Sequence, residues 1–131
     1  MSNGGSALQV LAEQLRTEDT PIAEHVIDPV GQAEPGLSDE YALVFEAVRE
    51  GYLLHYGESR LMAGHDADLG LLAGDYLYAL GLDRLAATGD IEAVAVLSEL
   101  IGRCAQLHAE GREDQVEPLW AAAARRLAGK G

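Results

Sequence analysis

A histidine followed by two aspartates near the middle of the chain has a spacing that could hold a divalent metal. The residues are His65, Asp66 and Asp68, in the stretch GHDADLG. Imidazole and carboxylate groups bind such ions, and a bound metal can activate water for hydrolysis. The competing interpretation is structural, because aspartate directly before a helix commonly caps its first turn. His65 and Asp66 are therefore the candidate metal ligands, and Asp66 or Asp68 is the candidate cap.

A small HD-like phosphohydrolase is the enzymatic alternative that this dyad suggests. Enzymes of that type bind a metal with a His-Asp dyad and other histidines carried on helices. The remaining histidines of this chain are His25, His55 and His108. Since the dyad follows a glycine at an expected helix start, we favour the capping interpretation and predict no metal site.

Asp75 is the carboxylate whose position is hardest to explain by capping. It projects among Leu71, Leu72 and Leu82 on an expected helix, so we expect it to be partly buried and paired. The candidate partners are Arg60, Arg84 and His55. A ligand site would use Asp75 with Arg60 and His55 as substrate-binding residues; the structural alternative, which we favour, is an internal tie that fixes the helix.

Cys104 and His108 stand four residues apart on one apolar stripe. At that spacing they could form a thiolate-imidazole pair or half of a metal site. Core packing is the favoured interpretation, because cysteine is among the residues most often buried. Cys104 is the single cysteine, so it cannot form an intramolecular disulfide, which fits a reducing compartment.

All secondary-structure elements of the chain are predicted to be helices, since no segment shows sustained period-two alternation. We expect a compact all-α bundle of about five helices, with residues 1–37 as a short helix and a Pro/Gly-containing arm and residues 38–131 as the helical bundle domain. The expected helices are 6–16, capped by Ser6; 38–55, capped by Ser38; a long helix from Asp66 or Asp68 to Gly89; 91–108, capped by Asp90; and 118–127. Residues 61–63 are expected to form a helical turn.

Two helices have patterns that predict which face is buried. In the helix from Ser38, an apolar stripe lies opposite Glu46, Arg49 and Glu50, which we therefore expect to face solvent. In the next helix, three glycines fall within roughly 40° of one another, each costing about 1 kcal/mol relative to alanine. They are Gly70, Gly74 and Gly81. Leucines cover most other directions, so we expect this helix to be the centre of a bundle or to be shared with a second subunit.

The run LLAGDYLYALGLDRLAATGDIEAVAVLSELI, residues 71–101, resembles a segment of trans-polyprenyl diphosphate synthases. It resembles even more the small non-catalytic subunit of heteromeric heptaprenyl or hexaprenyl diphosphate synthases. The similarity extends over residues 51–112, about half of the chain, with Ala73-Gly74-Asp75-Tyr76 and Gly89-Asp90 as its most specific points. The resemblance implies an isoprenoid synthase fold in which this helix contributes to a dimer interface. The implied interface residues are Gly70, Gly74, Tyr76, Leu77, Leu80 and Gly81.

The residues on which that family's chemistry depends are missing. No DDxxD motif, which binds magnesium around the substrate diphosphate, occurs in the chain. The family's RRGxPT-like turn would fall on residues 55–60, where only Gly57 matches. We therefore expect a subunit that is not catalytic alone, has no cofactor of its own and meets Mg²⁺ only through a catalytic partner, whose prenyl cavity it would help to shape.

Composition limits the possible partners and location. The chain has 131 residues, the length of one domain, and a net charge of −13 from 22 acidic and 9 basic residues. This charge would repel nucleic acid. No signal peptide or membrane-spanning run is recognisable, so we expect a cytoplasmic protein. The expected partners are a second copy or another protein, and an acidic helical adaptor unrelated to isoprenoids is a further alternative.

Overall fold

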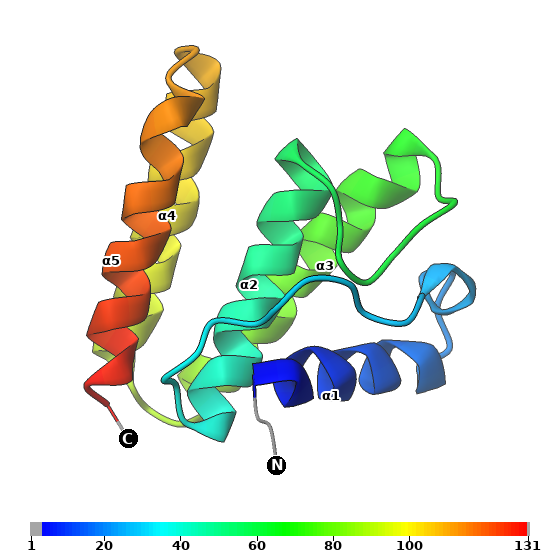
Figure 1. Cartoon of the computed structure of the whole chain (residues 1–131), viewed down its shortest axis with the longest axis horizontal. Coiled ribbons are helices and arrows are strands. Elements are labelled where there is room, and N and C mark those ends of the chain that lie inside the picture. The colour runs from blue at the N-terminus through cyan, green and yellow to red at the C-terminus, as the bar shows by residue number, and fades with distance from the viewer. Residues whose placement is uncertain (1–3, 131) are drawn as a thin grey trace.

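Five α-helices form the protein in the computed structural model, which describes residues 4–130. They are α1 (Gly4–Thr17), α2 (Asp39–Tyr56), α3 (Ala67–Ala87), α4 (Ile91–Ala109) and α5 (Val116–Ala128), with two short 3-10 helices, Ala23–His25 and Glu113–Gln115. Figure 1 shows α2 beside α3, α1 across the base of this pair, and α4 and α5 as a hairpin alongside. The expected all-α architecture is confirmed.

Several helix ends follow the sequence signals closely. The Asp66 carboxylate accepts a hydrogen bond from the backbone N–H of Leu69 at 2.8 Å, so Asp66 caps α3. Asp90 caps α4 in the same way, through the N–H of Ala93 at 3.0 Å. Gly89 ends the turn between them with φ of +83°, a conformation that favours glycine.

Other boundaries differ from expectation. Ser6 lies inside α1, which begins at Gly4, and Ser38 occupies the N-cap position of α2 without a side-chain capping hydrogen bond. The last helix begins at Val116, two residues before the expected start. Residues 61–63 form no helical turn, because Met62 pairs with Val26 in an isolated antiparallel bridge. Long-range pairing with the arm therefore overrides the local preference.

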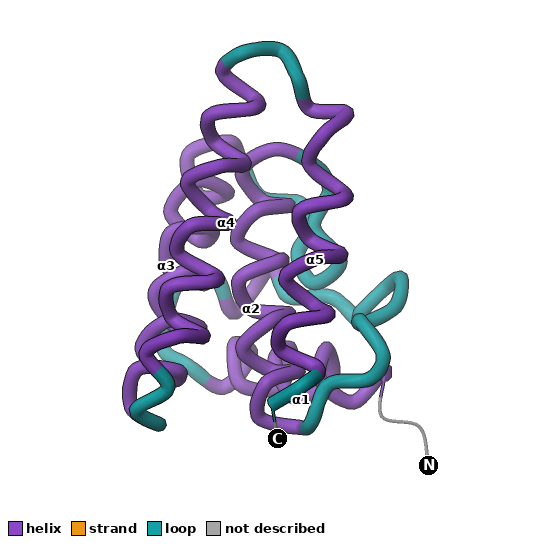
Figure 2. Tube along the Cα trace, turned by 90° about the vertical axis from the view of Figure 1, so that its left-hand side faces the viewer, coloured by secondary structure: helices purple, strands orange, loops and turns teal. Residues whose placement is uncertain are grey.

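The central helix is α2, which touches α1, α3, α4 and α5. For the helix from Asp66 or Asp68 to Gly89, the expected place at the centre of the bundle is wrong, while the alternative that it is shared with a second subunit stays a prediction. Among residues 4–130, α3 packs mainly on α2 and α4, and its Ala73 and Leu77 join the cluster that contains α1. Its outward side leaves Leu71 50% and Leu72 66% exposed. Figure 2 shows α2 within the bundle and α3 at its margin. None of the described helices combines the length and apolar content that crossing a bilayer needs.

The glycine seam of α3 faces α2 of the same chain. A Cβ atom on Gly74 would lie 3.0 Å from the carbonyl oxygen of Gly51, and one on Gly81 would lie 3.1 Å from that of Val44. Gly51 completes the contact from α2, since its own Cβ would lie 2.8 Å from the carbonyl oxygen of Gly74. The two backbones thus approach closely only because side chains are absent there.

Two apolar clusters share α2 between them. One lies between α2, α4, α5 and the C-terminal half of α3, and the other lies between α1, α2, α3 and the arm that follows α1. The largest buried side chains of the first include Phe45, Leu85, Leu97, Trp120 and Leu127, and those of the second include Leu8, Leu11, Leu15, Leu61 and Leu77. The arm is thereby packed against the bundle and can carry part of a site.

Candidate binding site

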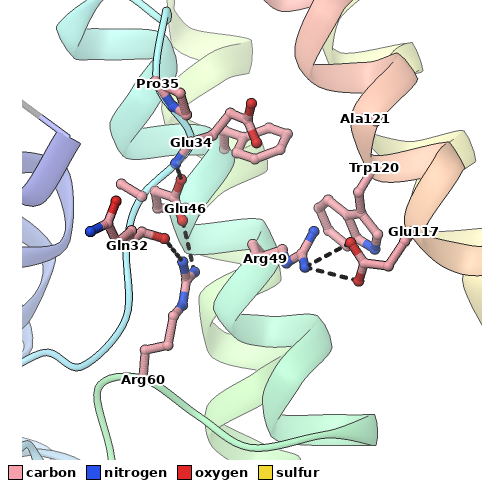
Figure 3. A pocket seen from close by; sticks show the side chains of 11 residues that line it. Gln32, Glu34, Pro35, Glu46, Arg49, Arg60, Glu117, Trp120 and Ala121 are labelled. Carbon is pink, nitrogen blue, oxygen red and sulfur yellow. Dashed lines mark hydrogen bonds and ion pairs between the residues drawn. The ribbon is translucent and has the colours of Figure 1, made fainter.

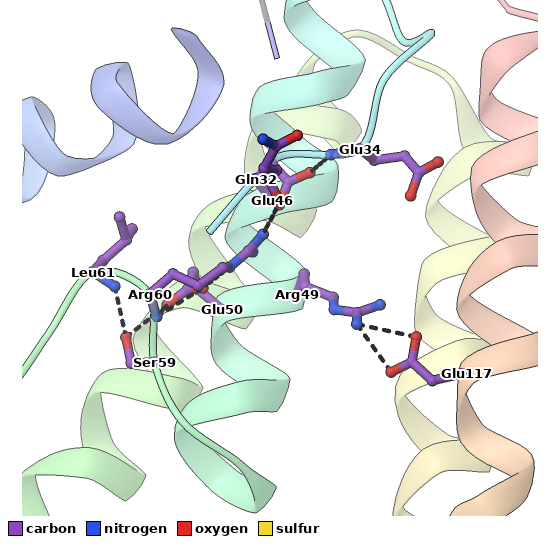
Figure 4. A network of polar contacts seen from close by, with 9 residues as sticks. All are labelled: Gln32, Glu34, Glu46, Arg49, Glu50, Ser59, Arg60, Leu61 and Glu117. Atoms are coloured by element: carbon purple, nitrogen blue, oxygen red, sulfur yellow. Dashed lines mark hydrogen bonds and ion pairs between the residues drawn. The ribbon is translucent and has the colours of Figure 1, made fainter. Parts of the chain in front are cut away.

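A buried ionic network on α2 is the most unusual polar feature of the structure. Glu46 and Glu50 are only 1% and 0% exposed. Arg60, from the turn after α2, reaches both: its Nη2 lies 2.7 Å from Glu46 Oε1 and its Nε lies 2.6 Å from Glu50 Oε2. Figure 4 shows this network between α2 and the two chain segments beside it. One guanidinium thus bridges two carboxylates that are shielded from water.

The remaining oxygen lone pairs of the two glutamates hold the neighbouring backbone. Glu50 accepts hydrogen bonds from the Ser59 hydroxyl at 2.7 Å and from the backbone N–H of Arg60 at 3.1 Å. Glu46 accepts one from the backbone N–H of Glu34 at 2.7 Å, and Arg60 donates to the carbonyl of Gln32 at 2.9 Å. The network therefore fixes the arm at residues 32–34 against α2.

The charge state of Arg60 follows from these contacts. Burial by itself would lower its pKa, but the charges and hydrogen bonds of Glu46 and Glu50 outweigh burial and raise the pKa above its usual value. Removing ions from water costs several kcal/mol each, so such a network persists only when its hydrogen bonds are complete. Its clear structural consequence is a fixed arm.

A pocket of about 310 Å³ lies next to the network, between the arm, α2 and α5. Figure 3 shows Arg60 and Gln32 on one side and Arg49, Trp120 and Glu117 on the other. The complete lining consists of Gln32, Ala33, Glu34, Pro35, Phe45, Glu46, Arg49, Arg60, Glu117, Trp120 and Ala121. Apolar and charged groups thus both line this one cavity.

Arg49 and Trp120 form the side of the pocket nearer to α5. The Arg49 guanidinium carbon lies 4.9 Å from the centre of the Trp120 ring, and its Nη2 contacts Glu117 Oε2 at 3.0 Å and Oε1 at 3.2 Å. Trp120 also packs edge-on to Phe45, with 5.7 Å between ring centres. An aromatic face and a carboxylate here hold a guanidinium of the same chain.

The residues expected to bind substrate are not brought together. His55 Nε2 lies 3.1 Å from Asp75 Oδ1, so one of the proposed pairs does form. Asp75, however, is 70% exposed at its side chain, and the expectation that it is partly buried is wrong because α3 turns this side to solvent. Arg60 belongs to the buried network, and Arg84 pairs with Glu40 on the surface at 3.2 Å.

The candidate metal ligands also separate. Asp66 is engaged as the cap of α3, while His65 lies against His25 with 6.3 Å between ring centres. The buried Nδ1 of His65 has no hydrogen-bond partner among residues 4–130. In that same part of the chain, no three His, Cys, Asp or Glu side chains come together as a metal-binding group.

The residues implied as a dimer interface have contacts within the chain. Gly70, Gly74, Leu77 and Gly81 are buried, with the glycine seam against α2. Tyr76 and Leu80 pack against the cluster that contains α1. The Tyr76 hydroxyl donates to Glu18 at 2.5 Å, a hydrogen bond that raises the tyrosine pKa to about 12 with help from partial burial.

Cys104 and His108 do not interact as a nucleophile and base. Cys104 is 0% exposed, and burial raises its pKa to about 11, so it is a neutral thiol at physiological pH. His108 instead shares a 2.8 Å hydrogen bond through Nε2 with the Tyr52 hydroxyl and stacks on Tyr56 at 4.0 Å.

The important residues that sequence reasoning missed lie mainly on α2. Glu46 and Glu50 were expected to face solvent with Arg49, and that prediction is wrong because the arm and the turn at residues 57–60 cover this side of α2. A signal was present: apolar residues occur nearly all round α2, as in a helix surrounded by neighbours. Two glutamates four apart in such a helix indicate buried, paired carboxylates.

No protein-family model, curated protein or solved structure matched the chain. The function of the pocket has to be inferred from its own chemistry.

Proposed function

We propose that the protein is a helical interaction subunit, without catalytic activity of its own, whose pocket between the arm, α2 and α5 receives part of a protein partner. The observation that carries this proposal is the anchoring of the pocket wall by Glu46 and Arg60, through Glu34 N–H and the Gln32 carbonyl. A rigid wall reduces the entropy that binding would otherwise cost.

The pocket's chemistry supports binding over catalysis. Arg60 is paired with Glu46 and Glu50, and Arg49 with Glu117, so both pocket arginines are engaged with carboxylates of the chain. The chain's thiol, on Cys104, is buried and neutral. These groups suit recognition of a complementary surface more than proton transfer or nucleophilic attack.

The resemblance over residues 71–101 suggests one partner for this interaction. A catalytic prenyl diphosphate synthase subunit would supply the magnesium-binding aspartates that this chain lacks. In that arrangement the present subunit would help to shape the cavity in which the prenyl chain grows.

Co-purification from the native host tests the interaction directly. The bait is the full-length tagged chain, compared with Ala121→Trp, which fills the pocket, and with Ala86→Trp, a matched substitution at an exposed position of α3. We expect the wild type and Ala86→Trp to retain one stoichiometric partner and Ala121→Trp to lose it, with all three unfolding at similar temperatures.

Two results would contradict the proposal: a wild-type bait that recovers no stoichiometric partner, or equal recovery by all three baits. If the partner is a prenyl synthase, the isoprenoid link is supported. If it belongs to an unrelated complex, that link is wrong while the interaction function stands.

A further inference from the structure

The charges around the pocket are unbalanced in favour of carboxylates. Four glutamates, at positions 34, 46, 50 and 117, line it or bind its arginines, against two guanidinium groups, those of Arg49 and Arg60. The whole chain also carries a net charge of −13. A cation is therefore attracted to this site and an anion is repelled.

Glu34 supplies the carboxylate that is left over. Its backbone N–H is held by Glu46 at 2.7 Å, so its position on the arm is fixed. Its side chain is half-buried and forms no hydrogen bond or ion pair with any residue in the described range 4–130. Figures 3 and 4 show this side chain extending from the arm towards α5, on the pocket side. It is a pre-positioned acceptor without a donor.

The contacts of Arg49 show that an aromatic face beside a carboxylate binds a guanidinium group in this pocket. Its guanidinium lies over Trp120 and bonds to both oxygens of Glu117. Glu34 offers a second carboxylate, and Pro35 and Ala121 offer apolar contacts beside it. The two arginines already present repel an incoming cation little, because each is neutralised by its own glutamates.

We propose that the pocket binds an arginine side chain of the protein partner, with its guanidinium on Glu34 and its aliphatic part against Pro35 and Ala121. This inference rests on the proposed interaction function and names the chemistry that the partner must present. Arginine fits better than lysine because its planar group pairs with a carboxylate through two hydrogen bonds and is less strongly hydrated. A cavity of about 310 Å³ accommodates one such side chain.

The single tryptophan of the chain makes the test specific, because the Trp120 ring lines the pocket and its buried indole N–H gives one resonance that reports on changes at this ring. The full chain is titrated with Nα-acetylarginine N-methylamide, its neutral citrulline isostere and the matching glutamate derivative. We expect saturable shifts with the arginine probe, at least about tenfold weaker binding of the citrulline probe, and weaker binding still of the glutamate probe.

Two variants distinguish the effect of the Glu34 contact on binding from the effect of the protein's overall charge. Glu34→Gln is expected to weaken binding of the arginine probe about tenfold. Glu99→Gln removes the same charge from an exposed site on α4 and is expected to leave the affinity unchanged. Unchanged amide spectra away from the pocket verify that both variants are folded.

The proposal is overturned if the arginine probe gives no saturable shift, if citrulline or glutamate binds as tightly, or if the two variants weaken binding equally. These outcomes are distinct from failure of the interaction function. Partner recovery that depends on Ala121 without arginine binding contradicts only the ligand class, whereas arginine binding without a recovered partner contradicts only the interaction function.

Discussion

Two of the charged clusters on α2 differ mainly in how far the neighbouring chain covers them. In the first, the side chains of Glu46, Glu50 and Arg60 are 1%, 0% and 15% exposed. In the second, the side chains of His55 and Asp75 are 20% and 70% exposed, and His55 Nε2 lies 3.1 Å from Asp75 Oδ1. The first cluster also anchors the arm through backbone hydrogen bonds, while Asp75 contributes only the exposed pair. Burial, more than distance, distinguishes a structural network from a surface contact.

This difference shows that the sequence pattern of a single helix does not predict whether its carboxylates are buried. Leucines flank Asp75 on its own helix, yet within residues 4–130 no neighbouring element covers that side of α3. Glu46 and Glu50 were expected on a solvent-facing side of their helix, yet the arm and the turn after α2 bury them. What lies opposite a residue in space decides its environment.

Arg60→Leu should give the largest effect on stability. It leaves two buried carboxylates without their cation, which costs about 3–5 kcal/mol when one partner of a buried pair is removed. Urea unfolding of the variant measures this loss. Arg84→Leu is the matched control, since Arg84 pairs with Glu40 at side-chain exposures of 41% and 43% and should change stability by at most about 1 kcal/mol. Equal losses in the two variants would remove the distinction between the clusters.

Gly74→Ala should give an intermediate effect and would disturb the second cluster through packing. The added Cβ would collide with the His55 ring and press on the Gly51 carbonyl, so the ring must turn away from Asp75. Overpacking costs about 1–3 kcal/mol, more than the roughly 1 kcal/mol that alanine gains over glycine in a helix.

Gly102→Ala is the control for that substitution. In the part of the chain that the structure describes, nothing lies within 4 Å of a Cβ at this position of α4, so the variant should gain up to about 1 kcal/mol of stability. Thermal unfolding of both variants shows whether each substitution raises or lowers the melting temperature. A stabilised Gly74→Ala would show that α2 and α3 are not in the described close contact.

Asp75→Asn should give the smallest effect. The exposed His55–Asp75 pair is screened by solvent, so we expect a loss below about 1 kcal/mol in urea unfolding at neutral pH. A loss as large as that of Arg60→Leu would mean that Asp75 is the structural tie first expected from the sequence.

The parts of the fold that local chemistry determines were predictable. Asp66 and Asp90 cap helices through their own first turns, and Gly89 adopts the left-handed conformation between them. The close approach at Gly74 was also predictable, since an otherwise costly glycine indicates a backbone contact. These signals depend on residues near one another in the chain.

The parts that depend on tertiary contacts were not predictable from one sequence. The bridge between Val26 and Met62 and the cover that the arm places over Glu46 join segments far apart in the chain. The pocket was missed for the same reason: Arg49, Glu34 and Glu117 come from three elements and share no local motif. Trp120, which also lines the pocket, lies within the expected helix 118–127, whose pattern gives no sign of a site.

Hydrogen exchange at the backbone amide of Glu34 tests most directly whether the buried network holds the pocket wall. The amide belongs to the arm, outside any helix, and its protection depends on the 2.7 Å hydrogen bond to Glu46. We predict slow exchange in the wild type and loss of protection in Glu46→Ala under conditions where both remain folded. Exchange of the wild-type Glu34 amide at the rate of an unstructured chain would contradict the account.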